Sequence, residues 1–468
     1  MAKFKEYNQH QMMLMPPNLD EKVPEGHLAR HISNVVDQMD IREIEEKYSE
    51  LGCRGYHPRM LIKLLVYGYS IGIRGSRRIQ KETREDLVFM WLAGMQEPDF
   101  RTISDFRKDR IGDIRKLFTQ VLDTCRELGM VSCGKISIDG TKIGASSGKN
   151  KLTYRKKLER SKAKYEDEVD RILKEAEEID AEEDRLYGDR DGYTLERQYS
   201  AEEIRKALKK VERKKEKLAK ETEKVQSKIT AVNEKLQIMG DNRNSFGNTD
   251  HDATLMLMKE GGLGVGYNVQ MATENQVIVG FGVFQNPDDN HLLQPMIEEV
   301  EQNLGTKPEA VVTDKGYCSH RNYEYVASRG IKAAIPPQTY DYDIVARRRG
   351  TYRYSKNLEY ERLKVGMLDF LETEEGQGLQ KKRKHDIEPT FGDIKHNMGF
   401  RKFLLRFKPK VTTEVGLISI AHNIKKIRNW LERREMASHI CRRGTPTGHF
   451  TGFNRPILKL HCKGWAFP

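Results

Sequence analysis

The sequence predicts an α/β core that follows an all-α N-terminal domain and is interrupted by an inserted, antiparallel coiled-coil hairpin of two helices. Three observations support this fold class. Helical patterns fill residues 1–130, short β-rich runs alternate with amphipathic helices over residues 131–435, and residues 151–240 carry a heptad-like apolar repeat. Residues 436–468 remain as a C-terminal tail.

The composition points to an anionic partner. The chain has 468 residues, enough for two or three domains, and its 82 Lys and Arg against 70 Asp and Glu give a net charge of +12. This balance favours nucleic acid, such as double-stranded DNA, although a basic surface without such a partner is the alternative. The six cysteines form no CxxC pair, and no apolar run approaches the roughly 18 residues of a membrane span. We therefore expect a cytoplasmic protein in a reducing compartment and no membrane partner.

The N-terminal domain is predicted from helix boundaries and clustered arginines. Pro58 suits the first turn of one helix, and Ser76 is a candidate N-cap for the next. Thr102 or Ser104 would cap a third helix. Short helices joined by tight turns are typical of helix-turn-helix-like DNA-binding domains. A plain helical bundle with a charged exterior fits the pattern equally well. The candidate DNA contacts in this domain are Arg74, Arg77, Arg78 and Arg107.

The inserted segment has the pattern of two long helices. Ser200 and Glu203 form a capping box at the start of the second helix, and YGDRDGY is a turn signal between the two. A dimerisation arm, a DNA-gripping arm and a solvated arm without a partner all fit this pattern. Apolar residues in the second helix recur at steps of four and three, in eight of ten positions: Ile204, Leu208, Val211, Lys215, Leu218, Thr222, Val225, Ile229, Val232 and Leu236.

The core is predicted from an ordered series of strands and helices. Glu274 and Asn275 are expected to form a tight turn between its second and third strands, and a long loop is expected before the helix that contains Glu388. Strands are expected at 135–140, 267–273, 276–284, 310–314 and 332–337, and helices at 291–305 and 320–330.

Three carboxylates occupy distinctive places in this series. Asp139 ends the first strand, Asp314 ends the strand AVVTD, and Glu388 lies on the helix after the long loop. Acids at strand ends point into the crevice beyond a sheet edge, where open α/β sheets hold their sites. A single acid of this kind is ordinarily a surface residue or a cap, so only their joint arrangement indicates a site.

The chemistry suited to three such acids is metal-dependent phosphodiester cleavage. Two Mg²⁺ ions about 3.5–4 Å apart can serve the attacking and the leaving oxygen. Mg²⁺ prefers carboxylate oxygens and takes few protein ligands, and Mn²⁺ is equally compatible with oxygen ligands. We therefore expect the three acids to converge on a pair of divalent ions.

The segment around Glu388 is strongly basic, which suits phosphate contacts. Residues 381–434 hold 15 Lys and Arg against 5 acids, a local net charge of +10. On an α-helix, Lys384, Glu388 and Lys395 would share one face. Further candidate DNA contacts in this segment are Arg383, Arg401 and Lys402.

The sequence resembles the DDE transposases of bacterial insertion sequences, which have a ribonuclease-H-like core. The resemblance rests on GYHPRMLIKLLVYGYSIGIRGSRRIQKE near the N-terminus and on ISIDGTKIGASSGKNKLTY, GVGYNVQMATENQVIVGF, VVTDKGYCS and IEPTFGDIKHNMGFRKFLLR further along. These blocks follow the family order from about residue 20 to about residue 430. Several blocks in order are far more specific than one motif.

The resemblance implies that Asp139, Asp314 and Glu388 are the catalytic acids and metal ligands, with Asp139 bridging the two ions. The family signature around the glutamate places a tyrosine and an arginine before it and a lysine after it. Lys395 fits this signature, but Lys381 and Lys384 stand at the tyrosine and arginine places. Lysine lacks the planar fork of arginine, so the phosphate contacts are expected to differ.

The resemblance also implies an activity and an assembly. The N-terminal domain would bind terminal inverted repeats, and the core would cleave the element ends and join the freed 3′-OH to target DNA. Two ends must be brought together, which implies a homodimer or a larger synaptic complex. About 120 residues separate the first two strands, so the hairpin is expected to protrude and leave the sheet intact. A metal-dependent nuclease and a catalytically inactive DNA-binding derivative are the alternatives.

Overall fold

The computed structural model divides the chain into two compact units, Met1–Lys426 and Ile427–Pro468. Among the residues that it describes, no helix is both long and apolar enough to cross a bilayer. The described residues are 18–48, 55–110, 114–187, 201–240, 243–258 and 261–443. The predicted capping box at Ser200 and Glu203 and most of the YGDRDGY turn therefore lie outside the described side chains.

The N-terminal part of the chain consists of helices, as predicted. Pro58 is the first residue of its helix, where its missing N–H costs nothing. Two predicted caps are wrong: Gly75 precedes the helix at Ser76, and Asp99, rather than Thr102, accepts the free amides of the next helix start. The helices are α1 (Leu19–Lys22), α2 (Leu28–Gln38), α3 (Arg42–Glu45), α4 (Pro58–Ser70), α5 (Ser76–Glu85), α6 (Leu87–Leu92), α7 (Phe100–Asp105), the π-helical turn η1 (Phe106–Arg110) and α8 (Ile114–Glu127).

The core is a six-stranded mixed sheet with the order β4-β5-β1-β7-β8, in which β6 also pairs with β5. Strand β1 runs antiparallel to β5 and parallel to β7. This arrangement of antiparallel strands followed by parallel ones agrees with the expected ribonuclease-H-like order. The strands are β1 (Lys135–Gly144), β4 (Thr254–Leu257), β5 (Leu263–Glu274), β6 (Val277–Phe284), β7 (Ala310–Val312) and β8 (Lys332–Ala334).

The turn between β5 and β6 lies one residue later than predicted. Asn275 and Gln276 both have positive φ, 55° and 64°, as a tight hairpin turn requires. Glu274 instead ends β5 and is buried. Its carboxylate accepts hydrogen bonds from the backbone amides of Ser132, Cys133 and Gly134, which anchors the start of β1.

Helices cover both faces of the sheet near β6. Phe281 packs edge-to-face against Phe118 of α8, with ring centroids 5.0 Å apart. The next residues on the opposite face, Gly280 and Gly282, lie against α11 (Leu293–Leu304). Gly305 has φ 68° and ends this helix as predicted. Alternate side chains of β6 therefore face two different helices.

The free edge of β6 is covered by the last long helix, α16 (Lys408–Arg443). The Asn423 side chain accepts a hydrogen bond from the Ile278 amide at 2.9 Å and donates to the Ile278 carbonyl at 2.8 Å. The amide thus pairs with β6 as a neighbouring strand would.

The second half of the core contains more helix than expected. The predicted long loop before Glu388 is wrong, because two helices, α13 (Tyr340–Arg348) and α14 (Leu358–Glu372), fill most of it. Asn357 caps α14 by accepting a hydrogen bond from the Tyr360 amide. The remaining elements are the short helix η4 (Lys315–Tyr317), α12 (His320–Ser328), α15 (Glu374–Gly392) and the π-helical turn η5 (Asp393–Asn397).

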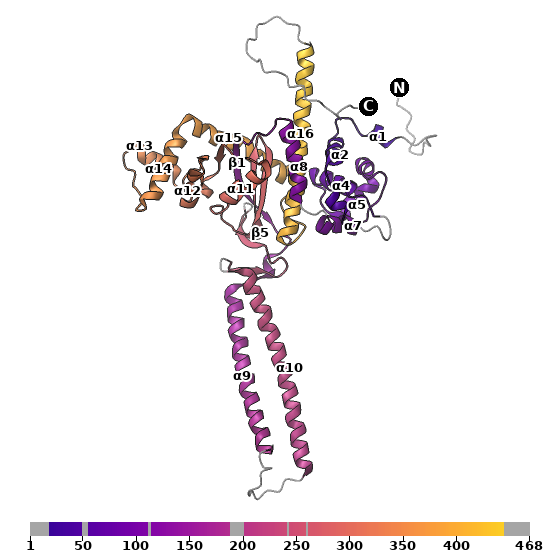
Figure 1. Cartoon of the computed structure of the whole chain (residues 1–468), viewed down its shortest axis with the longest axis vertical. Coiled ribbons are helices and arrows are strands. Elements are labelled where there is room, and N and C mark those ends of the chain that lie inside the picture. The colour runs from indigo at the N-terminus through magenta and orange to yellow at the C-terminus, as the bar shows by residue number, and fades with distance from the viewer. Residues whose placement is uncertain are drawn as a thin grey trace, which may run out of the picture. The chain divides into compact units, whose positions relative to one another are not determined.

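The insert forms two long helices, α9 (Arg155–Tyr187) and α10 (Ala201–Met239), which lie side by side (Figure 1). Ile172, Ile179, Val211, Leu218 and Val225 form one buried apolar cluster between them. The helices are antiparallel, because interhelix ion pairs join positions that rise in α9 to positions that fall in α10: Arg171–Glu221, Asp180–Lys215 and Glu182–Lys214.

A small two-stranded sheet closes the base of these helices. Strand β2 (Leu152–Tyr154) precedes α9 and pairs antiparallel with β3 (Ser245–Gly247), which follows α10. The ends of the insert therefore lie close together, and β1 pairs directly with β5. The insert leaves the main sheet intact, as expected.

A buried polar link joins the N-terminal helices to the core. Tyr69 of α4 donates a hydrogen bond to Glu414 of α16 at 2.8 Å, and Arg107 donates to the Tyr69 oxygen at 3.1 Å. Glu414 also accepts from the backbone amides of Leu404 and Leu405. Burial raises the pKa of Tyr69, so its hydroxyl remains a donor.

Candidate active site

The three predicted acids line a single cavity of about 560 Å³. Asp139 comes from β1, Asp314 follows β7, and Glu388 comes from α15. The other lining residues are Gly140, Lys142, Leu257, Met258, Asn268, Asp289, Arg383 and Phe391. The fold thus brings side chains from distant parts of the sequence to one place.

Parallel pairing of β1 with β7 places the two aspartates near each other. The register joins Ser137 to Val312, so Asp139 and Asp314 each lie two residues beyond this pair. Asp139 does not end its strand as predicted, since β1 continues to Gly144. Strand β7 is the one that ends, and Asp314 caps the following short helix by accepting from the Gly316 amide.

A buried aspartate fixes α15 against β1. Ser137, which shares a face of β1 with Asp139, donates a hydrogen bond to Asp386 at 3.0 Å. Asp386 also accepts from the Gln276 amide. Burial raises the pKa of Asp386 despite these hydrogen bonds. This contact places Glu388, two residues further along α15, over the same face of the sheet.

Arg383 lies between two of the three acids. Its guanidinium donates to Asp139 Oδ2 at 3.2 Å and to Glu388 Oε1 at 3.4 Å. The Arg383 side chain is 15% exposed, as is that of Asp139, whereas Glu388 is 53% exposed. Arg383 is therefore a cation that orients this part of the cavity, where the Glu388 carboxylate faces solvent and the Asp139 carboxylate is largely covered.

Two lysines predicted to share the face of Glu388 do not line the cavity. Lys384 is exposed on α15, one position away from Arg383. Lys395 lies in the π-helical turn Asp393–Asn397. A π-helical turn contains an extra residue, so Lys395 does not share a helix face with Glu388 as it would on a regular α-helix. Arg383, which was predicted as an adjacent contact, occupies the position facing the acids.

The cavity has the donor chemistry of a site for a hard divalent cation. Its acids offer carboxylate oxygens, which Mg²⁺ and Mn²⁺ prefer. Among the described residues, however, no three His, Cys, Asp or Glu side chains stand close enough together to hold a metal ion as they are oriented. The expected convergence on a metal pair thus requires movement of side chains such as Glu388.

A buried polar network adjoins the acids, and no sequence pattern predicts it. Tyr317 donates a hydrogen bond to Gln270, whose side-chain amide donates to Asn268 and to Asp289. Burial raises the pKa of Tyr317 well above its ordinary value, and the negative charges of nearby Asp289, Asp139 and Asp314 add to this. Tyr317 is therefore a permanent donor at physiological pH.

The N-terminal arginines differ in their surroundings. Arg107 is only 3% exposed, and its guanidinium donates to the Tyr69 oxygen and to the Arg74 carbonyl. This burial does not fit the predicted DNA contact at Arg107. Arg77 and Arg78 are exposed on α5, where Arg77 lies over the Phe100 ring and Arg78 pairs with Glu82.

The loop after η5 connects the helical N-terminal part with the core. Arg74 donates to the carbonyls of Lys402 and Gly399 and lies 4.7 Å from the Phe400 ring centroid, so it supports this loop. Lys402 also bridges to Gly144 at the end of β1. The side chains of Arg401 and Lys402 are exposed.

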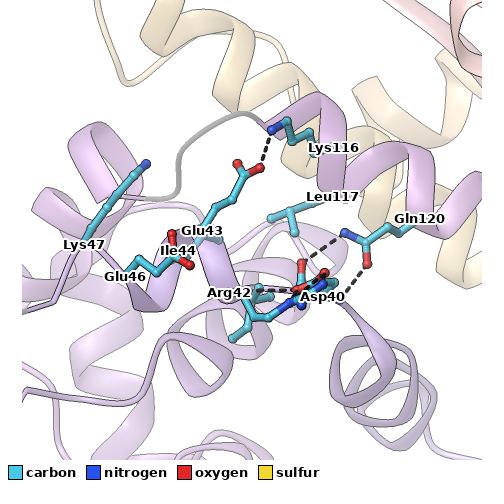
Figure 2. A pocket seen from close by; sticks show the side chains of 10 residues that line it. Asp40, Arg42, Glu43, Ile44, Glu46, Lys47, Lys116, Leu117 and Gln120 are labelled. Atoms are coloured by element: carbon cyan, nitrogen blue, oxygen red, sulfur yellow. Dashed lines mark hydrogen bonds and ion pairs between the residues drawn. The ribbon is translucent and has the colours of Figure 1, made fainter.

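A second pocket, of about 260 Å³, lies between α3 and α8 (Figure 2). Lys116 pairs with Glu43, and the Gln120 side chain both accepts from and donates to the Asp40 backbone. Arg42 pairs with Asp40. These polar groups pair with one another across the pocket, and their contacts hold α3 against α8.

Comparison with known families finds two domains in this chain. A family model described as a transposase domain (DUF772) matches residues 17–109, and a model described as a transposase DDE domain matches residues 249–424. The second match contains Asp314 and Glu388, whereas Asp139 precedes it. No curated protein and no solved structure matches the chain.

The two matched domains follow each other in one chain, on either side of β1 and the helical insert. The DDE domain implies a ribonuclease-H-like core, and the strand order agrees with it. The protein is therefore an enzyme that acts on DNA, and it belongs to the DDE transposases of insertion sequences.

Proposed function

We propose that this transposase binds the terminal inverted repeats of its own insertion sequence, cleaves the element ends and joins their 3′-OH groups to target DNA. The observation that carries the proposal is the shared cavity of Asp139, Asp314 and Glu388. The same cavity also contains Lys142 and Arg383, which provide positive charge beside the acids. Such a combination suits a phosphodiester, whose phosphate is attracted by the cations while the acids hold metal.

Each acid has a proposed role in holding two Mg²⁺ ions, or Mn²⁺ in their place. Asp139 would contact both ions, Asp314 would bind on one side, and Glu388 would bind on the other after a rotamer change. When bound, the ions would supply an activated water and stabilise the leaving oxygen. The water oxygen would bond to phosphorus while the bond from phosphorus to the 3′ oxygen breaks, and the 3′ oxygen would take a proton to become the free 3′-OH. That 3′ oxygen would later bond to a phosphorus of the target, and the target's own 3′ oxygen would leave.

Arg383 has a positioning role in this scheme. It holds Asp139 and Glu388 together through two hydrogen bonds. When Glu388 turns towards metal, one end of the guanidinium is released for a DNA phosphate. The side chain thus keeps the acids in place and contributes to substrate binding in turn.

DNA recognition is proposed for basic residues, most of them exposed, on two parts of the chain. Arg77 and Arg78 on α5 would contact the terminal repeat, together with Arg74 if its loop contacts open. The core would contact the phosphate backbone near the cleavage site through Lys384, Lys395, Arg401 and Lys402.

We propose that α9 and α10 form an antiparallel coiled-coil arm. The buried apolar seam and the interhelix ion pairs support this interpretation. Transposition joins two ends, so a homodimer or larger synaptic complex is proposed. The arm could serve dimerisation, DNA binding or neither.

Oligonucleotide assays with cognate ends test the proposed chemistry. Asp139→Asn, Asp314→Asn and Glu388→Gln should each lose cleavage by at least about 10²-fold and still bind the ends. Glu324→Gln, which alters an exposed glutamate of α12, is the matched control and should cleave normally. Unchanged cleavage in the three variants would exclude this site as the catalytic site. Loss of cleavage in the Glu324→Gln control alone would indicate a catalytic site in another part of the protein.

Precut ends separate strand transfer from nuclease activity. The proposal expects joined products when a precut end with a free 3′-OH is mixed with target DNA and Mg²⁺. Cleavage of intact ends without any joining would favour a metal-dependent nuclease on the same core. Binding without cleavage, at every metal tested, would favour an inactive DNA-binding derivative.

A further inference from the structure

Asp289 is a fourth carboxylate at the cavity, and neither the three-acid pattern nor the proposed roles include it. It lies in the loop between β6 and α11 and lines the cavity with Asp139, Asp314 and Glu388. The Leu292 amide donates to its carbonyl, which fixes the loop just before the helix. Three features of its surroundings indicate a function.

The first feature is the way in which the carboxylate is held. Asp289 Oδ1 accepts hydrogen bonds from the Asn268 side chain at 2.7 Å and from the Gln270 side chain at 2.6 Å. Both amides are fully buried, and Gln270 is itself fixed by Tyr317. Neutral donors orient a carboxylate and leave its negative charge uncompensated, unlike an arginine or lysine.

The second feature is the close approach of Asp289 to two glycines, Gly140 after Asp139 and Gly316 after Asp314. A Cβ at Gly140 would lie 2.8 Å from Asp289 Oδ1 and would collide with the Gln270 amide. A Cβ at Gly316 would lie 3.0 Å from Asp314 Oδ1 and 3.6 Å from Asp289 Oδ2. Asp289 and Asp314 therefore face the same small space beside Gly316.

The third feature is the distribution of counter-charge. Arg383 pairs with Asp139 and Glu388. In the described part of the chain, no lysine, arginine or histidine forms an ion pair with Asp289 or Asp314. Two carboxylates that face one space repel each other unless a cation lies between them.

We propose that Asp289 is a further metal-binding acid, which holds a divalent cation together with Asp314 on the side of the cavity away from Arg383. This inference rests on the proposed function, because it assumes that Asp314 is a metal ligand. The buried amides of Asn268 and Gln270 turn Asp289 Oδ2 towards the ion. Oxygen ligands and double negative charge suit Mg²⁺ or Mn²⁺.

The test measures Mn²⁺ binding by the full chain without DNA. The electron paramagnetic resonance signal of free Mn²⁺ reports how much of the ion is bound. Asp289→Asn keeps the shape of the side chain and should weaken Mn²⁺ binding by about tenfold or more, as loss of one supporting group does at metal sites. Asp288→Asn changes the exposed neighbouring acid and is the matched control, with unchanged binding expected. Binding of the DNA ends in EDTA should be the same in both.

A second variant guards against misfolding of the first. Gly316→Ala puts a methyl group into the space between Asp289 and Asp314, at a residue without positive φ, and should also weaken Mn²⁺ binding. Circular dichroism reports whether each variant is folded.

The outcomes separate this inference from the proposed function. If Asp314→Asn loses Mn²⁺ affinity while Asp289→Asn and Gly316→Ala bind like the Asp288→Asn control, the role of Asp289 is overturned and the metal site remains. If Asp314→Asn itself binds Mn²⁺ normally, the proposed metal site fails as a whole. Weakened binding in Asp289→Asn and Asp314→Asn, with a normal control, supports both.

Discussion

The candidate active site and the α9–α10 arm are both rich in charge, but they hold their charges differently. In the arm, ion pairs such as Arg171–Glu221 lie on the exposed flanks of an apolar seam, and their side chains are 63% and 39% exposed. In the cavity, Arg383 and Asp139 are each 15% exposed and are positioned by buried groups such as Asp386. The exposed ion pairs of the arm contribute little to stability, whereas removing one partner of the buried pairs in the cavity is strongly destabilising.

The difference also concerns how far apart the interacting residues lie in the sequence. The arm is held by a repeat that each helix carries within itself, so its packing follows from local periodicity. The cavity depends on the register of β1 with β7 and on the docking of α15. Substitutions at four positions, two in the core and two in the arm, test this contrast.

The largest effect is expected for Arg383→Ala. Loss of the guanidinium leaves Asp139 and Glu388 without the group that holds both, and misplacement of catalytic groups costs about 10²-fold in rate. Cleavage of end oligonucleotides measures the loss. Lys381→Ala, an exposed change on the same helix, is the control and should stay within about threefold. Equal activity of the two variants would show that the cavity does not depend on Arg383.

The next effect is expected for Ile172→Ala in the arm. Ile172 is 3% exposed within the seam, so truncation should destabilise the helical pair by about 2–4 kcal/mol. Amide hydrogen exchange of α9 and α10 measures this, and exchange in the main sheet should not change. Leu173→Ala is the matched control, because its side chain is 55% exposed. A similar loss of protection in both variants would contradict packing through this seam.

A smaller, pH-dependent effect is expected for Asp393→Asn at the start of η5. Burial would raise the pKa of Asp393, but hydrogen bonds from His422, Lys425 and Asn397 outweigh it and hold the pKa well below its usual range. A lowered pKa means that the folded state favours the charged form. Its stabilisation is present at neutral pH and is lost as pH falls from about 5 through the lowered pKa.

Denaturation with urea at several pH values measures this effect. The original chain should be more stable than Asp393→Asn by about 1.5–3 kcal/mol at pH 7, and the gap should narrow towards pH 3. Asp288→Asn is again a suitable control and should follow the original chain. A gap that stays constant with pH would rule out the charged form of Asp393 as its source.

The smallest effect is expected for Arg171→Ala on the arm. The Arg171–Glu221 pair is 3.2 Å long and exposed, so its loss should change the stability of the arm by less than about 1 kcal/mol. The same hydrogen-exchange measurement detects it, and added salt should reduce it further. A loss as large as that of Ile172→Ala would mean that the arm is held by its charges rather than by its seam.

The sequence predicted the parts of the molecule that depend on local pattern. The seam residues Val211, Leu218 and Val225 are buried as their spacing indicated, and Pro58 and Gly305 mark helix ends as predicted. The positions of β1, β5, β6, β7 and β8 along the chain also followed from their apolar runs, whereas β4 was not predicted. Helix α13 was missed because its segment is largely polar, whereas α14 was missed although Leu363, Met367 and Leu371 recur in it at helical spacing.

The candidate site was predicted only where its chemistry is visible in the sequence. The sequence indicated three acids by their positions next to strands or within a basic helix: Asp139, Asp314 and Glu388. Their catalytic roles remain predictions. Asp289 and Asp386 look like ordinary loop and helix acids, since their meaning comes from partners more than 15 residues away. Arg107 was misjudged because burial of a charged residue depends on partners such as Tyr69, which spacing does not show.

The side-chain amide at the β6 margin of the sheet has a consequence for how copies of this protein can associate. Asn423 of α16 pairs with Ile278 on β6, so a helix occupies hydrogen-bonding positions at this outer strand. A strand from another molecule cannot simply add to the sheet there, which guards against aggregation when many copies gather on DNA. Association at this margin must then use the surface of a helix, whose geometry can be selected without strand-to-strand polymerisation.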